Sequence, residues 1–102
     1  NGHWYERTHA LINLAWAQLG AGHVDRAIPP AQQALAVIDR VAPENCELRF
    51  QIHAVLASAQ HLLGNRREFR GAAAAALNCQ KYADAERELI EKMTVLAHTS
   101  NP

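Results

Sequence analysis

Histidine and cysteine side chains are the groups in this sequence that could bind a metal or move a proton. The chain has six histidines and two cysteines, and the imidazole group titrates near neutral pH. His53 and His61, on one expected helix, would be separated by about 80° around its axis and about 12 Å along it, too far to share one ion. His9 could approach His61 from a facing helix, but no carboxylate or cysteine is placed to complete a site. We therefore expect dispersed histidines and no metal.

The two cysteines fall near the same end of an expected helical hairpin. A turn centred near residue 65 pairs Cys79 with Gln51 instead of Cys46, an offset of about 7 Å along the helix axis. This offset predicts free, buried thiols and no disulfide. The sequence has no Cys-x-x-Cys, glycine-rich phosphate loop, serine nucleophile elbow or paired carboxylates. We accordingly predict that the chain is not an enzyme and needs no cofactor.

The charge balance argues against a broad electrostatic surface. Ten basic residues offset ten acidic ones, so nucleic acid is an unlikely partner through this domain. The basic cluster of Arg66, Arg67 and Arg70 contains Glu68 and is typical of a solvated helix face. No apolar run approaches the roughly 18 to 20 residues of a membrane span. The excess of arginine over lysine and the missing initiator methionine favour a fragment of a larger, bacterial, cytoplasmic protein.

The elements that would position these side chains repeat along the chain. A shift of 42 residues superimposes small and apolar residues on like residues, and within each copy they keep helical spacing on both sides of one glycine. Such a unit cannot bury its apolar face alone, so repetition at this period predicts an α-solenoid of stacked helical hairpins. The pairs are Arg7/Arg49, Leu14/Leu56, Ala15/Ala57, Ala17/Ala59, Gln18/Gln60, Gly22/Gly64, Ala31/Ala73, Ala34/Ala76 and Leu35/Leu77.

The pattern predicts an all-α fold of about five helices. A single domain over 1–102 would hold repeat 1 (about 4–42), repeat 2 (about 43–83) and a C-terminal capping helix (about 84–98). Pro29 and Pro30 predict an irregular or 3₁₀ first turn over 25–28 in the second helix, and Pro43 is expected to open the third. Asn65 followed by Glu68 is typical of a capping box at the start of the fourth. The expected helices span 4–20, 25–41, 43–63, 66–80 and 84–98.

These residues resemble the tetratricopeptide repeat family, in the long variety found in kinesin light chains and bacterial regulators. The likeness is carried by the stretch Ala10-Leu11-Ile12-Asn13-Leu14-Ala15 followed by Gly22, Ala27 and Ala34-Leu35, and in the second copy by Leu56, Ala57, Gly64 and Ala76-Leu77. The second copy departs from the first at Val55 and Phe69. The resemblance implies antiparallel helix pairs stacked into a right-handed superhelix, with a concave face that holds a peptide or a partner's helix.

Matching the family's groove positions to this sequence gives a set of candidate binding residues. Trp16 is the leading candidate because an exposed aromatic ring can anchor an apolar side chain, although it could equally fill a gap between helices. Ile12, Trp16 and Val55 stand where relatives that clamp acidic peptides carry polar groups, so a ligand of mixed polarity is implied. The groove residues that this matching gives are His9, Ile12, Asn13, Trp16, Gln51, Val55, Ser58 and His61.

The function that these observations favour is a non-catalytic scaffold of a bacterial regulator or adaptor that binds a protein or peptide segment. A different possibility is an effector-sensing domain of a transcriptional regulator, in which the same concavity encloses a small molecule. A third is an architectural role, with self-association through the exposed ends of the repeats.

Overall fold

The computed structural model describes residues 3–79, and these residues form four α-helices. They are α1 (Trp4–Gly20), α2 (Val24–Val41), α3 (Cys46–Leu63) and a fourth helix over residues 66–79. The described part of the chain is therefore all-α, as predicted, with one helix fewer than the five expected. The expected fifth helix, over 84–98, lies outside the described residues. None of the helices in the described part is long and apolar enough to cross a membrane.

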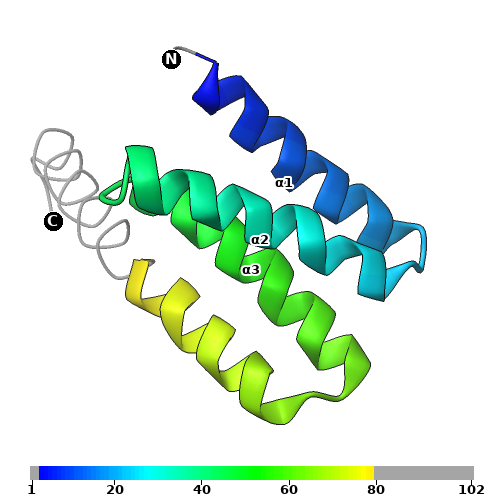
Figure 1. Ribbon diagram of the computed structural model, residues 1–102. Coiled ribbons are helices and arrows are strands. Elements are labelled where there is room, and N and C mark those ends of the chain that lie inside the picture. Colours follow the sequence, from blue (N-terminus) through cyan, green and yellow to red (C-terminus); the bar gives the residue numbers. More distant parts are fainter. Residues whose placement is uncertain (1–2, 80–102) are drawn as a thin grey trace, which may run out of the picture.

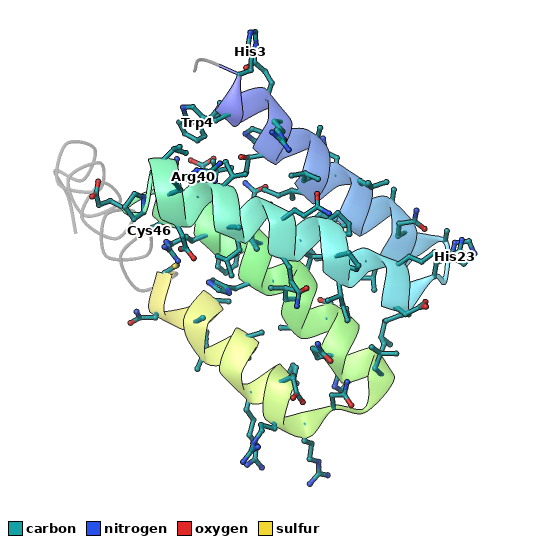
Figure 2. All side chains as sticks on the ribbon, in the orientation of Figure 1. His3, Trp4, His23, Arg40 and Cys46 are labelled. Carbon is teal, nitrogen blue, oxygen red and sulfur yellow. The ribbon has the colours of Figure 1, made fainter. Side chains whose placement is uncertain are left out.

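The helices alternate in direction, so that α1 with α2 and α3 with the 66–79 helix form two antiparallel hairpins (Figure 1). The turns within the two hairpins lie at one end of the molecule, and the connection from α2 to α3 lies at the other. His23 marks the first of these ends, whereas Trp4, Arg40 and Cys46 lie toward the second (Figure 2). The helices α1 and α3 therefore run in the same direction, with α2 returning between them.

The two hairpin turns are built from the same hydrogen bonds, 42 residues apart. Gly22 has φ of 86° and Gly64 has φ of 78°, a left-handed conformation that glycine adopts without steric cost. Just after each glycine, a backbone N–H donates to the carbonyl five residues earlier, from His23 to Gln18 and from Asn65 to Gln60, both at 2.9 Å. The sequence repeat is therefore also a repeat of backbone structure.

The side chains of the turns repeat as well, which changes the role expected for Asn65. Its Nδ2 donates to Gln60 Oε1 at 2.7 Å, and the matching His23 Nδ1 lies 3.2 Å from Gln18 Oε1. The Asn65 amide thus points back to the end of α3 and closes the turn, so the predicted capping box with Glu68 is not the contact that it makes.

The core is a single cluster that α2 shares with both of its neighbours. The buried face of α2 is lined mainly by alanines, which allow close approach of the flanking helices because they project little beyond the backbone. Leu48, Ile52 and Val55 of α3 are each at most 1% exposed and cover one side of this face. The members are Ile12, Ala15, Ala27, Ala31, Ala34, Ile38, Leu48, Ile52 and Val55.

The structure corrects two expected helix starts. α2 is α-helical from Val24 and contains both prolines, so residues 25–28 are regular. A proline at position 29 or 30 deprives the carbonyl of Asp25 or Arg26 of its intrahelical donor, and both of these residues are exposed, so water can replace the donor.

The other correction concerns α3, which begins at Cys46 and not at Pro43. Pro43 occupies a turn closed by a bond from Asn45 N–H to Ala42 O at 3.0 Å, a position that suits its fixed φ. Asn45 is the N-cap, because its Oδ1 accepts from the Leu48 N–H at 3.0 Å.

We predict opposite effects for two glycine-to-alanine changes of the same size. Gly64→Ala should lower the free energy of unfolding by about 1–2 kcal/mol, because its backbone is left-handed. Gly71→Ala should raise it by about 0.5–1 kcal/mol, since Gly71 is helical with nothing within 4 Å of an added Cβ. Urea denaturation measures both. Equal shifts in one direction would contradict the assigned turn.

Candidate functional site

An exposed strip of aromatic side chains runs along α1 beside the core. Tyr5 is 48% and Trp16 is 40% exposed, and the rings of Tyr5 and His9 meet at 4.5 Å with an interplanar angle of 66°. At about 100° per residue, Tyr5, His9 and Trp16 fall within about 60° of the buried Ile12, all on the same side of it. We call these three residues the aromatic strip.

A matching strip of less bulky side chains lies on α3. Gln51, Ser58 and Leu62 fall within about 60° of the buried Val55 by the same rotation, again on one side. Leu62 is 62% exposed, whereas Gln51 and Ser58 are half-buried. The Ser58 hydroxyl donates to the Ala54 carbonyl at 2.9 Å, so its one donor hydrogen is already bonded within the helix. The helices α1 and α3 are in contact.

The structure separates the predicted groove residues into three groups. His9, Trp16, Gln51 and Ser58 retain exposed surface on the two strips. Asn13 is exposed but lies about 60° beyond Trp16 around α1, away from the core contact. Ile12 and Val55, at 1% and 0% exposure, are core residues and are removed from the candidate surface.

His61 also departs from the predicted groove, because it faces the following helix. Its ring lies 5.2 Å from the ring of Phe69, and both line a small cavity of about 170 Å³ at the second turn. The second copy has the aromatic Phe69 where the first copy has Ala27. The large ring in the second copy gives His61 a partner that the first copy lacks.

Tyr5 is the residue that sequence reasoning missed. The signal was available, because Tyr5 stands four residues before His9 and is therefore its neighbour on one helix face. The 42-residue step pairs Tyr5 with the exposed Glu47, so no aromatic residue of the second copy marks this position.

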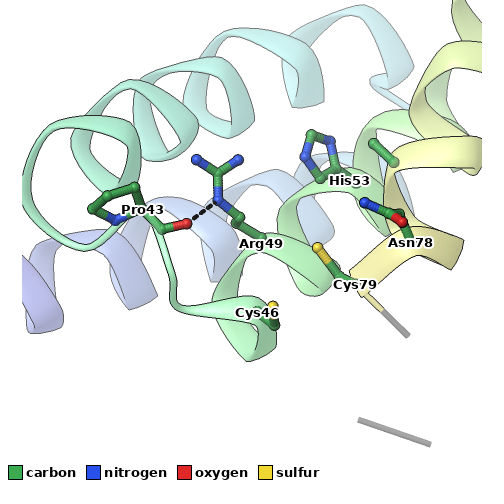
Figure 3. A pocket seen from close by; sticks show the side chains of 7 residues that line it. Pro43, Cys46, Arg49, His53, Asn78 and Cys79 are labelled. Carbon is green, nitrogen blue, oxygen red and sulfur yellow. Dashed lines mark hydrogen bonds between the residues drawn. The ribbon is translucent and has the colours of Figure 1, made fainter. Parts of the chain in front are cut away.

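A second cavity, of about 290 Å³, lies between α3 and the 66–79 helix at the end opposite the two hairpin turns (Figure 3). We call it the thiol pocket, since both cysteines line it. Arg49 borders it and holds the α2–α3 connection, donating from Nε to the Pro43 carbonyl at 2.7 Å and pairing with Asp39 of α2. The lining residues are Pro43, Cys46, Arg49, His53, Ala75, Asn78 and Cys79.

A third cavity, of about 380 Å³, lies between the start of α1 and the end of α2. Trp4, Val37 and Val41 give it apolar walls, and Arg7 and Arg40 give it two guanidinium groups. Arginine in such a place can receive a carboxylate or phosphate. Within residues 3–79 we find no group of three or more His, Cys, Asp or Glu side chains that could hold a metal ion.

His53, which lines the thiol pocket, makes the stability of the fold depend on pH. Burial, helped by the nearby Arg49 charge and opposed by Asp39, lowers the pKa of His53 below its ordinary 6.5. The unfolded chain therefore binds a proton at a higher pH than the folded chain, and the stability that His53 contributes above pH 6.5 is lost as the pH falls below that value.

We predict that His53→Gln removes part of this loss of stability in acid. The melting temperature of the wild-type chain should fall as the pH is lowered from 7 to 5, and the variant should fall less, because glutamine takes up no proton. His3→Gln, at an exposed position outside the pocket, is the matched control and should follow the wild type. Parallel curves for His53→Gln and the wild type would refute the assignment.

Comparison with known proteins assigns no family to this chain. No family model matches it, and no curated protein or solved structure matches it either.

Proposed function

We propose that this chain is a non-catalytic binding module of the tetratricopeptide type, an α-solenoid segment of a bacterial cytoplasmic regulator or adaptor. It captures a protein or peptide segment on the surface that the aromatic strip of α1 and the neighbouring strip of α3 form together. The observation that carries the proposal is the aromatic strip itself, since half-exposed tyrosine and tryptophan beside a packed core are typical of interface anchors.

The repeat supports a common face for the two strips. The 42-residue step pairs His9 with Gln51 and Trp16 with Ser58, and it also pairs the two hairpin turns bond for bond. With α1 and α3 running in the same direction (Figure 1), equivalent residues of the two helices project to the same side. The two strips then form one continuous surface.

The chemistry of this surface selects among peptides. Neither strip contains a lysine, arginine, aspartate or glutamate, so the surface offers aromatic faces, one aliphatic group and amide or hydroxyl hydrogen bonds. An acidic peptide would find no lysine or arginine on it. A segment with apolar side chains that alternate with polar ones, extended or helical, is the ligand that fits.

The shape of the surface favours a macromolecular segment over a small effector. None of the three cavities described above is lined by Trp16, whereas small-molecule sites enclose most of the ligand surface. An exposed strip that spans two helices suits a ligand that is long in one direction.

The test is selection of peptides from a random library displayed on phage against the full chain. We predict that selected peptides carry an aromatic or aliphatic anchor and that Trp16→Ala weakens their binding by at least about tenfold, as expected for a central anchor. Leu77→Ala is the matched control, because Leu77 is an apolar residue 65% exposed on a different helix. Titration calorimetry measures both variants, and circular dichroism checks that each remains folded.

Two results would contradict the proposal. Binding that survives Trp16→Ala but is lost in Leu77→Ala would place the surface elsewhere. Failure to select any peptide, together with a small molecule that raises the melting temperature of the wild type but not of Trp16→Ala, would favour the effector-sensing alternative.

A further inference from the structure

The two cysteines of the chain meet in the thiol pocket, although they come from different helices. Cys46 is the first residue of α3, and Cys79 lies on the 66–79 helix. Both line the same cavity, and Figure 3 shows their side chains as neighbours across the gap between the helices. The two cysteines line one cavity despite the offset of about 7 Å expected from the sequence, and both are free thiols, as predicted.

The reason lies in the face that α3 presents to its hairpin partner. Cys46, His53 and Ala57 recur at a spacing of seven and four residues, which places them on one side of α3. Cys79 of the 66–79 helix lines the same cavity as Cys46 and His53 of this side. Counting residues back from the turn pairs backbone positions only, and it does not include the length and direction of the side chains.

We propose that Cys46 and Cys79 are an oxidation site, at which a peroxide converts the two thiols into a reversible disulfide that fastens the second hairpin. The proposal is independent of the binding surface on α1 and α3, since no residue of the aromatic strip lines the thiol pocket.

The two thiols differ in the way that such a reaction requires. Cys46 is half-exposed and Cys79 is only 8% exposed, so a dissolved peroxide reaches Cys46 first. Burial, then the adjacent Cys46 and the hydrogen bond with it, raises the pKa of Cys79, against a smaller lowering by Arg49. Cys79 therefore stays a protonated thiol, shielded from solvent, while the more exposed Cys46 reacts with the peroxide.

The reaction balances with hydrogen peroxide as the oxidant. The Cys46 sulfur attacks one peroxide oxygen, the O–O bond breaks, and a sulfenic acid and one water are formed. The Cys79 sulfur then attacks the Cys46 sulfur, the S–O bond breaks, and the departing hydroxide takes the Cys79 proton to leave as a second water. Two thiols are oxidised, one peroxide is reduced, and a dithiol reductant reverses the bond by exchange.

The surroundings favour a thiol pair over a metal site. His53 also lines the pocket, but no third histidine, cysteine or carboxylate among the described residues joins the two sulfurs in a geometry that could hold an ion. A zinc site normally needs four ligands. The two thiols of this pocket are therefore more suited to react with each other than to bind a metal ion.

The experiment uses the full chain, reduced, freed of reductant and treated with hydrogen peroxide. Because the chain has two cysteines, any disulfide within one molecule must join Cys46 to Cys79. Mass spectrometry of the denatured protein should show a loss of two hydrogen atoms in a monomer, and dithiothreitol should restore them. The melting temperature should rise by roughly 5–15 °C on oxidation, since the bond closes a long loop of the unfolded chain.

A displaced cysteine provides the matched control. In the double variant Cys46→Ala with Glu47→Cys, the new thiol lies on the exposed side of α3, about 100° around the helix from Cys46. It keeps the number of cysteines and nearly the same loop, so it should form the disulfide at least about tenfold more slowly, for want of the required approach. Cys79→Ser should stop at a sulfenic acid on Cys46, which dimedone traps.

Three outcomes would overturn the proposal. One is a wild-type chain that keeps two free thiols, or advances to sulfinic acid, under peroxide that oxidises a small thiol. Another is a disulfide that forms only between molecules. The third is a displaced-cysteine variant that closes as fast as the wild type, because chain fluctuation and not the pocket would then bring the sulfurs together.

Discussion

The packing of α2 between α1 and α3 is the contact on which the rest of the described structure depends. The face of α2 that enters the core is mostly alanine, which contributes little apolar surface per residue but lets the helix backbones approach closely. The larger side chains come from the neighbours, Ile12 on one side and Leu48, Ile52 and Val55 on the other. A small domain gains most of its stability from such burial. The strips on α1 and α3 therefore owe their relative position to this one helix.

This packing also explains why equivalent residues of α1 and α3 differ. The 42-residue step pairs Ile52 with Ala10 and Val55 with Asn13. The α3 residues are fully buried in the core that α3 shares with both helices of the first hairpin, whereas Ala10 and Asn13 are exposed. The same register therefore yields apolar side chains where a helix is covered and small or polar ones where it is not.

Much of the described fold was predictable from the sequence, because the repeat, the helical spacing and the glycines are local signals. The bounds of α1 and the left-handed turns at Gly22 and Gly64 follow from them. The start of α3 was misplaced because Pro43 fits both a first helical position and a turn, and only the side chain of Asn45 decides between them.

The candidate surface was predicted less well. A helix rotation of some tens of degrees decides whether a residue such as Ile12 or Val55 lies in the core or at the surface, and both lie in the core. Counting residues back from the turn did not predict that Cys46 and Cys79 line one cavity, because such counting does not include the length and direction of side chains.

The two adjacent prolines of α2 have a consequence for how the molecule opens. Residues 29 and 30 supply no amide protons, so the first turns of α2 are held by fewer backbone bonds than the matching turns of the 66–79 helix, where the equivalent Gly71 and Ala72 both carry an amide proton. Local opening starts where cooperative bonding is weakest. Local opening of the first hairpin should therefore begin at its Gly22 end. The first hairpin should be the more flexible of the two, and the second hairpin the more rigid.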